Sequence, residues 1–240
     1  MHLANIKAVI LAGGAGTRLY PITKEIPKPL LPVKRRPILN YLIDLFHSFG
    51  IRDIAILINK DFREDFNWWK KRYYGSTGSP QGLKIKLMEE KKPLGTFGGL
   101  WLLKDWISNN SFFLTNGDEL KKINLSKMIN FHQKFQRPAT IALVKVPNPK
   151  DYGVVICQKG IVQEFLEKPK DSPTKYINSG LYLLSPEIFH YHPGPKFLMI
   201  EKDLFPKLAK EKKLAGFKFN GKWMDTGTWQ RYSQALKKWR

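Results

Sequence analysis

The sequence predicts an α/β fold in which helices cover both faces of a mixed, mostly parallel sheet. Short apolar runs alternate with segments of helical periodicity through the first half of the chain, a pattern typical of parallel strands joined by crossover helices. The second half contains more strands and shorter helices, so we expect later strands to extend or cap the sheet. With 240 residues, 42% of them hydrophobic, the chain is long enough to bury a substantial core.

The individual elements follow from hydrophobic periodicity and from glycine and proline boundaries. The first strand is expected at 7–12, an apolar run that ends in glycines. A stretch rich in Gly and Ser at 75–82 is expected to be a surface loop. The helices are expected at 37–49, 61–73, 96–106, 125–135, 204–212 and 228–238. The remaining strands are expected at 53–58, 84–88, 111–115, 139–146, 153–157, 161–167, 176–184 and 214–220.

The chain is strongly basic, with 41 Lys and Arg against 20 Asp and Glu and a net charge of +21. Such a charge attracts nucleic acid, anionic lipid or phosphorylated small molecules. The lysines are spread along the whole chain and no nucleic-acid-binding motif is present, so we expect a solvated basic surface and no specific nucleic acid. A nucleic-acid-binding protein on the same fold remains an alternative, and it predicts a clustered positive face.

Several features bear on the compartment. The single cysteine, Cys157, excludes an intramolecular disulfide. No apolar run approaches the ~20 residues that span a bilayer, and the first residues show no secretory leader. We therefore expect a cytoplasmic protein without a membrane partner, either a monomer or a homo-oligomer.

A glycine-rich loop follows the first strand. Gly13, Gly14 and Gly16 remove side chains where the backbone approaches a ligand or takes positive φ, and their N–H groups can surround an anion. Arg18 adds a planar donor fork suited to phosphate oxygens, and Lys28 lies between two prolines. These residues predict a polyphosphate site.

Two better-known phosphate loops are excluded by spacing. The dinucleotide fingerprint requires a third glycine where this chain has Leu19, and no Gly-Lys-Ser/Thr triplet of a P-loop occurs. The loop from Gly13 to Leu19, with Pro27-Lys28-Pro29 behind it, instead resembles the N-terminal signature of the sugar-1-phosphate nucleotidyltransferases, also called nucleoside-diphosphate-sugar pyrophosphorylases. Further segments resemble motifs of this family, in family order: Glu89–Gly99, Asn116-Gly-Asp118, Asp151–Gly153, Glu167-Lys168-Pro169, Asn178-Ser-Gly180 and Trp223–Thr228.

The resemblance implies a three-layer α/β/α, Rossmann-like nucleotide-diphospho-sugar transferase fold without an appended β-helix domain. It implies one domain over 1–240, with a nucleotide-binding part at about 1–120 and a sugar-phosphate-binding part at about 121–240. It also implies transfer of a nucleotidyl group from an NTP to a sugar 1-phosphate, which gives an NDP-sugar and pyrophosphate with Mg²⁺ as cofactor.

The resemblance assigns roles residue by residue. The catalytic residues would be Arg18, Lys28 and Lys168, of which Arg18 holds the leaving pyrophosphate and Lys168 orients the sugar phosphate. The metal ligands would be Asp118 and Asp225, although Asp225 could instead cap the closing helix, a role that Thr228 could also fill. The nucleotide-binding residues would be Leu11, Ala12, Gly13, Gly14, Gly16, Thr17, Arg18, Glu90, Gly95 and Thr96. The sugar-phosphate-binding residues would be Asn116, Gly153, Glu167, Lys168 and Asn178.

The sequence leaves open which nucleobase the NTP carries and which sugar 1-phosphate is the acceptor. The compact length is similar to that of bacterial mannose- or heptose-1-phosphate guanylyltransferases and N-acetylmuramate-1-phosphate uridylyltransferases, which would place the protein in cell-envelope polysaccharide synthesis. A carboxylate at Glu90 can accept two N–H donors from guanine but only one from uracil, which slightly favours guanine. The alternatives are a thymidylyltransferase and a non-catalytic paralogue that senses sugar nucleotides.

Overall fold

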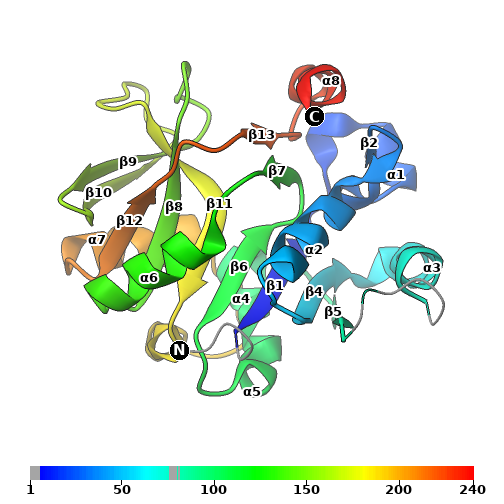
Figure 1. Ribbon diagram of the computed structural model, residues 1–240, viewed down its shortest axis with the longest axis horizontal. Helices are drawn as coiled ribbons and strands as arrows, with labels where there is room; N and C mark the ends of the chain where they lie inside the picture. Colours follow the sequence, from blue (N-terminus) through cyan, green and yellow to red (C-terminus); the bar gives the residue numbers. More distant parts are fainter. Residues whose placement is uncertain (1–5, 76–79, 81) are drawn as a thin grey trace. The chain divides into compact units, whose positions relative to one another are not determined.

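The computed structural model describes residues 6–75, 80 and 82–240 (Figure 1). The chain divides into two compact units. Unit 1 comprises Met1–Pro93, Thr115–Lys122 and Lys222–Arg240, and unit 2 comprises Leu94–Leu114 and Ile123–Gly221. Most of the expected surface loop at 75–82 lies outside the described residues. The prediction of a single domain over 1–240 stays a prediction.

Unit 1 is built on three parallel strands in the order β5-β4-β1. All five residues of β4 from Ile54 to Ile58 are buried, as expected for a strand covered on both faces. The strands are β1 (Lys7–Ala12), β4 (Asp53–Asn59) and β5 (Lys84–Glu90). Their carboxyl ends lie side by side because Ile58 pairs with both Ala12 and Glu89.

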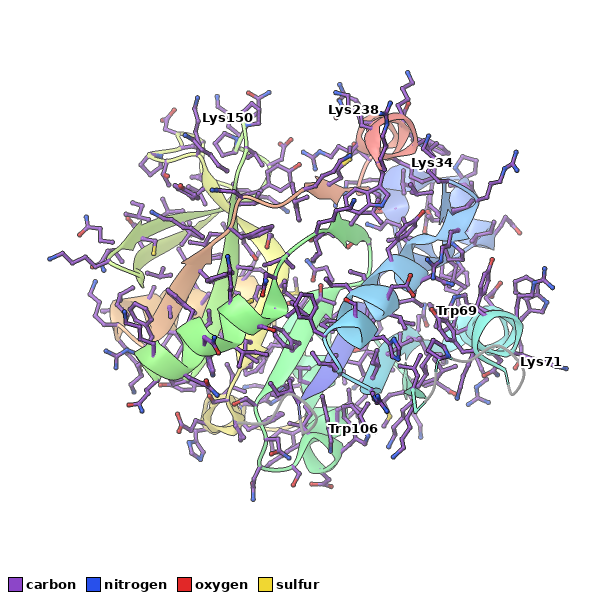
Figure 2. All side chains as sticks on the ribbon, viewed as in Figure 1. Lys34, Trp69, Lys71, Trp106, Lys150 and Lys238 are labelled. Carbon is purple, nitrogen blue, oxygen red and sulfur yellow. The ribbon has the colours of Figure 1, made fainter. Side chains whose placement is uncertain are left out.

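Two helices of unit 1 follow the predicted periodicity. Helix α2 (Ile38–Ser48) buries positions separated by three and four residues, including Leu39, Leu42, Ile43 and Phe46. Helix α3 (Arg63–Tyr74) contacts β4 and β5. Its buried Trp69, labelled in Figure 2, donates its indole N–H to Asn40 Oδ1 of α2 at 2.7 Å.

The remaining elements of unit 1 are short, apart from the last helix. Two small antiparallel ladders pair β2 (Pro32–Val33) with β3 (Arg36–Pro37) and β7 (Glu119–Lys121) with β13 (Trp223–Asp225). Helix α1 (Ile22–Glu25) precedes them, and α8 (Trp229–Lys238) ends the unit. A buried cluster joins α8 to the N-terminal segments and to β7, and it consists of Leu19, Leu31, Val33, Ile38, Leu120, Tyr232, Ala235 and Trp239.

Unit 2 contains a mixed sheet in the order β11-β8-β12-β10-β9. Strands β12 and β8 pair in parallel, whereas the other neighbours pair antiparallel. The strands are β8 (Ala139–Lys145), β9 (Gly153–Gln158), β10 (Ile161–Glu167), β11 (Tyr176–Leu184) and β12 (Leu214–Lys218). Figure 1 shows α6 (Leu125–Phe135) in front of these strands and α7 (Phe205–Lys210) behind them. This mixed sheet confirms the α/β class and the strand-rich second half.

The prediction of one continuous helix over 96–106 is wrong. The segment 96–106 forms α4 (Gly95–Gly98), a 3₁₀ turn (Gly99–Leu103) and α5 (Lys104–Ile107). Consecutive glycines weaken a helix, and here Gly98 serves packing instead, because a Cβ atom at this position would collide with the Lys196 carbonyl oxygen. Strand β6 (Phe112–Asn116) follows, and its residues fall partly in unit 2 and partly in unit 1.

Exposed lysines occur on both units. Figure 2 labels four of them, Lys34, Lys71, Lys150 and Lys238, on four different segments. This distribution agrees with a solvated basic surface. No helix in the described part of the chain is long and apolar enough to cross a lipid bilayer.

A buried histidine gives unit 2 a pH-dependent stability. His132 of α6 is 5% exposed, and its ring nitrogens contact Thr140 Oγ1 at 2.8 Å and Ser185 Oγ at 3.1 Å. Burial lowers the pKa of His132 to about 4. The unfolded chain then binds more protons between about pH 6.5 and pH 4, so the stabilisation is complete above this window and is lost as the pH falls through it.

We expect acidification from pH 7.5 to pH 5 to lower the free energy of unfolding of the wild type by about 2 kcal/mol more than that of His132→Gln. Denaturant titrations of both proteins at the two pH values measure this difference. Equal pH dependence in the two proteins would contradict the buried neutral state of His132.

Candidate functional site

The glycine loop begins at the carboxyl end of β1 and faces the end of β5. A Cβ atom at Gly13 would collide with Glu90 Oε2 and would lie 3.5 Å from the backbone nitrogen of Asn59. Only glycine therefore lets the Glu90 carboxylate lie against the loop. The carboxyl ends of parallel strands are where open α/β sheets bind ligands.

The second half of the loop has a local constraint of its own. Gly16 takes a φ of +65°, and its carbonyl oxygen accepts a hydrogen bond from Thr23 Oγ1 at 2.8 Å. Arg18 follows in a 3₁₀ turn, Thr17–Leu19, and is exposed while Leu19 is buried in the core. A Cβ atom at Gly227 would lie 3.0 Å from Arg18 Nη2, so this guanidinium lies close to the segment that follows β13.

Asp118 lies next to the loop because Gly117 packs against the end of β1. The Gly117 N–H donates to the Leu11 carbonyl oxygen at 2.9 Å, and a Cβ atom at Gly117 would lie 2.7 Å from that oxygen. The Asp118 carboxylate forms an ion pair with Lys28 Nζ, and these side chains are 26% and 11% exposed. Burial acts to raise the pKa of Asp118, but the Lys28 ammonium outweighs burial and holds this pKa below its ordinary value.

Asp225 is brought to Asp118 by the β7–β13 ladder. In this ladder Asp225 pairs with Glu119, and the N–H and hydroxyl of Thr226 both donate to the Asp118 carbonyl oxygen, at 3.2 and 2.7 Å. Asp225 Oδ1 accepts from the Gly227 N–H. The structure excludes Asp225 as the cap of α8, because Thr228 Oγ1 accepts the Arg231 N–H and fills that role.

Arg231 was not among the residues predicted from the sequence. Its Nη1 donates to Asp225 Oδ2 at 2.9 Å, and the two side chains are 19% and 11% exposed. Arg231 stands in the first turn of α8, where a cation is unfavourable for the helix dipole. The ion pair with Asp225 offsets this unfavourable interaction with the helix dipole. No pattern in the local sequence predicts that Arg231 and Asp225 pair.

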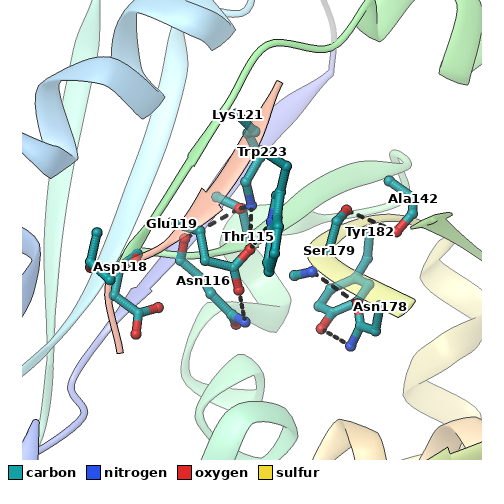
Figure 3. Close-up of polar contacts among 12 residues, drawn as sticks. Thr115, Asn116, Asp118, Glu119, Lys121, Ala142, Asn178, Ser179, Tyr182 and Trp223 are labelled. Atoms are coloured by element: carbon teal, nitrogen blue, oxygen red, sulfur yellow. Dashed lines mark hydrogen bonds and ion pairs between the residues drawn. The ribbon is translucent and has the colours of Figure 1, made fainter. Parts of the chain in front are cut away.

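A second polar network lies beside Asp118 (Figure 3). Glu119 Oε1 accepts from Asn116 Nδ2 at 2.9 Å, and Oε2 accepts from Trp223 Nε1 at 2.8 Å. Lys121 Nζ lies 3.2 Å from Oε2 and donates to Thr115 Oγ1 at 2.8 Å. Burial raises the pKa of Glu119 to about 7 against the opposing charge of Lys121.

The donor set of unit 1 fits a hard divalent cation. Among the residues that the structure describes, no three His, Cys, Asp or Glu side chains form a metal-binding group. Two carboxylates, Asp118 and Asp225, are nevertheless joined through the ladder, each balanced by one cationic side chain. One or two carboxylates, completed by water and substrate phosphates, are the usual protein contribution to a Mg²⁺ site.

Unit 2 contains most of the predicted sugar-phosphate residues. Gly153 pairs with Glu167 across β9 and β10, and a Cβ atom at Gly153 would lie 3.2 Å from Glu167 Oε2. Lys168 follows with a φ of +49°, and its Nζ lies 3.4 Å from Glu167 Oε1. Lys168 is 59% exposed, so its ammonium is accessible to an anionic ligand.

Asn178 has contacts within its own strand, also drawn in Figure 3. Its Nδ2 donates to Tyr182 Oη at 2.8 Å, and its Oδ1 accepts the Gly180 N–H at 2.9 Å. The pairing of β11 with β8 shifts register between Asn178 and Tyr182. These contacts stabilise the irregular strand, and the assignment of Asn178 to the sugar stays a prediction.

Gly95 and Thr96 belong to unit 2 and pack against the segment 198–201. Gly95 has a φ of +76°, and a Cβ atom there would collide with the Leu198 carbonyl oxygen. Thr96 Oγ1 donates to Glu201 Oε2 at 2.7 Å. Burial raises the pKa of Glu201, and the charge of Glu167 adds to this rise. Glu201 was missed in the sequence because an isolated Glu before a short helix carries no distinguishing pattern.

The two units thus divide the predicted residues. Unit 1 contains the strand end and glycine loop (Leu11, Ala12, Gly13, Gly14, Gly16, Thr17), together with Arg18, Lys28, Glu90, Asn116, Asp118 and Asp225. Unit 2 contains Gly95, Thr96, Gly153, Glu167, Lys168 and Asn178. Asn116, predicted with the sugar-phosphate group, therefore lies in the same unit as the glycine loop, and Gly95 and Thr96 lie with the sugar-phosphate group.

The chain is similar in sequence to known proteins. The chain is 34% identical over 233 residues to mannose-1-phosphate guanylyltransferase catalytic subunit beta of Xenopus tropicalis, covering 92% of this chain and 61% of that relative. It therefore spans about three fifths of the relative's length.

Solved structures show the same likeness. HddC from Yersinia pseudotuberculosis, complexed with GMP-PN, superposes with a TM-score of 0.80 at 27% identity, covering 98% of this chain and 100% of that one. A UDP-glucose pyrophosphorylase complexed with UDP-glucose gives a TM-score of 0.80 at 25% identity, covering 97% of each chain. Residues 7–240 match the family described as nucleotidyl transferase. The chain belongs to this nucleotidyl transferase family and has its Rossmann-like fold.

Proposed function

We propose that this protein transfers a nucleotidyl group from an NTP to a sugar 1-phosphate, forming an NDP-sugar and pyrophosphate. The observation that carries the proposal is the gathering in unit 1 of the glycine loop, Arg18 and Lys28 with the carboxylates of Asp118 and Asp225. Backbone N–H groups and fixed cations bind a triphosphate, and paired carboxylates suit the cation that accompanies it.

The chemistry assigns each group of unit 1 a task. An oxygen of the sugar phosphate attacks the α-phosphorus of the NTP, and the bond to the departing pyrophosphate breaks in line with it. The attacking phosphate is already ionised, so no general base is needed. The glycine loop and Arg18 hold the pyrophosphate, and Lys28 neutralises charge near the reacting phosphates. Catalysis then consists of positioning and charge neutralisation.

The cation that best suits this mechanism is Mg²⁺. Asp118 and Asp225 would hold it, because both are carboxylates and both belong to the β7–β13 junction. Bound there, Mg²⁺ would supply positive charge to the phosphates of the two substrates. Lys28 and Arg231 balance these carboxylates in the structure and keep the two carboxylates from repelling each other.

We assign guanine as the favoured base. Glu90 lies against the glycine loop at Gly13, and a carboxylate at the base edge accepts both N1–H and N2–H of guanine. The guanylyltransferase named among the relatives supports this choice. It also makes mannose 1-phosphate the first sugar to test. Glu167 would accept from sugar hydroxyls, and the exposed ammonium of Lys168 would bind the sugar phosphate. We place the reaction in the cytoplasm, where NTPs are supplied.

We expect pyrophosphate release in the presence of Mg²⁺ to be fastest with GTP and mannose 1-phosphate. The assay crosses GTP, UTP, dTTP and ATP with a panel of hexose and heptose 1-phosphates. Turnover with dTTP or UTP alone would overturn the guanine assignment and retain the reaction class. If no pair of substrates releases pyrophosphate and GDP-mannose nevertheless raises the melting temperature, the proposed catalytic activity is wrong and the protein is a sensor of sugar nucleotides.

We expect Asp225→Asn to weaken Mg²⁺ binding at least tenfold, because the amide contributes one neutral oxygen in place of a carboxylate. Calorimetric titration of Mg²⁺, with a non-hydrolysable GTP analogue present, measures this directly and independently of turnover. The matched control is Asp105→Asn on α5, which alters an exposed carboxylate. Wild-type affinity in Asp225→Asn, with its melting temperature unchanged, would remove Asp225 from the metal site.

A further inference from the structure

Lys121 of β7 is a fully buried lysine near the candidate metal ligand Asp118. The proposed mechanism gives this residue no role. The side chain of Lys121 is 0% exposed, and that of its partner Glu119 is 10% exposed. An ammonium is strongly destabilised in the interior unless it is paired. Buried ion pairs contribute little net stability compared with apolar residues of the same volume. The pair therefore calls for an explanation other than stability.

Glu119 connects three segments of the chain (Figure 3). Its carboxylate accepts from Asn116 at the end of β6, from Lys121 within β7 and from Trp223 in β13. Lys121 in turn donates to Thr115 of β6. Asn116, the member of this network that the sequence assigned to the sugar phosphate, is half-buried, whereas Thr115, Glu119 and Lys121 are buried.

The network decides which end of the Asn116 side chain is available. An ionised carboxylate only accepts hydrogen bonds, so Glu119 selects the NH₂ end of the Asn116 amide. The carbonyl oxygen Oδ1 is then the end presented to a ligand. A carbonyl oxygen accepts from a hydroxyl group, whereas phosphate oxygens are themselves acceptors and would need the NH₂ end. Lys121 supports this arrangement because its positive charge favours the ionised form of Glu119.

We propose that Glu119, held by Lys121 and Trp223, is a positioning residue that orients the Asn116 carboxamide so that its carbonyl oxygen accepts from a hydroxyl of the sugar 1-phosphate. The proposal rests on the proposed function and deepens it. It assigns Asn116 to the sugar ring and not to the phosphate. It also predicts selectivity for a sugar that carries a hydroxyl at the position facing Asn116.

Two double variants separate positioning from folding. Glu119→Gln with Lys121→Met and Glu119→Met with Lys121→Met both remove the two charges together, so neither leaves a lone buried ion. Both double variants are made in a Trp223→Phe background, which removes the indole donor that Glu119 Oε2 serves. In the first double variant the introduced glutamine can then turn its single carbonyl oxygen to the Asn116 NH₂ group. In the second, the methionine that replaces Glu119 retains the volume without this acceptor. The comparison between them isolates the hydrogen bond to Asn116.

Steady-state kinetics of the wild type and the two double variants provide the test. We expect the first double variant to keep the wild-type KM for mannose 1-phosphate within about threefold and the second to raise it about tenfold, the effect of one lost hydrogen bond. The KM for GTP should change less than about threefold in both. Analogues of mannose 1-phosphate that lack one hydroxyl each should include one for which the wild type and the second variant bind equally.

Equal sugar KM values in the two double variants would overturn the proposal, as would a rise confined to the KM for GTP. If the second variant does not fold, Asn116→Ala replaces it, with the same expected rise in sugar KM and the same insensitivity to one deoxy analogue. An Asn116→Ala variant with wild-type kinetics would equally overturn the proposal. An inactive wild type would instead contradict the proposed function. Failure of the positioning proposal and failure of the proposed function are therefore distinguishable.

Discussion

The candidate nucleotide site depends on the return of the chain to unit 1 after unit 2 is complete. The β7–β13 ladder pairs Glu119 with Asp225, more than 100 positions apart in the sequence. Thr226 closes the junction with two hydrogen bonds to the Asp118 carbonyl oxygen. Helix α8 then packs Tyr232 onto the N-terminal segments, and the Tyr232 hydroxyl donates to the Pro32 carbonyl oxygen at 2.7 Å. This junction brings the two candidate metal carboxylates to the glycine loop.

Charge balance is the second constraint on unit 1. Each candidate metal carboxylate is paired with a cation, Asp118 with Lys28 and Asp225 with Arg231. Arg18 approaches the same turn at Gly227. Arg18 has no carboxylate partner among the ion pairs of the described residues, so its guanidinium can bind the oxygens of a triphosphate. Many other Lys and Arg residues of the chain lie at exposed positions, such as Lys34, Lys71, Lys150 and Lys238 (Figure 2), where they contribute solubility and attraction for anionic substrates.

Regular elements of the fold were predictable because their pattern is local. Helix α6 and strand β11 have the predicted bounds, since an amphipathic period or a long apolar run determines them. Strands β7 and β13 were missed because three residues show no periodicity and their pairing is long-range. The prediction of one helix over 96–106 is wrong because Gly98 packs against the backbone of Lys196 and Leu198.

The candidate site divides in the same way. The glycine loop, Arg18, Lys28, Asp118 and Asp225 were identified because their residue types resemble a family motif, and the structure places them in one unit. Glu119, Lys121, Arg231 and Glu201 were not identified. Each has its role through a partner on another segment, such as Asn116 for Glu119 or Thr96 for Glu201. Such contacts become visible only when the segments are placed in space.

We propose that unit 1 binds the nucleotide phosphates between the glycine loop and a metal held by both carboxylates. The decisive experiment is a crystal structure of the protein with GDP-mannose and Mg²⁺. We expect phosphates against the Gly13–Arg18 segment, guanine at Glu90, and one Mg²⁺ coordinated by Asp118 and Asp225. Phosphates bound away from the glycine loop, or a metal held by neither carboxylate, would contradict it.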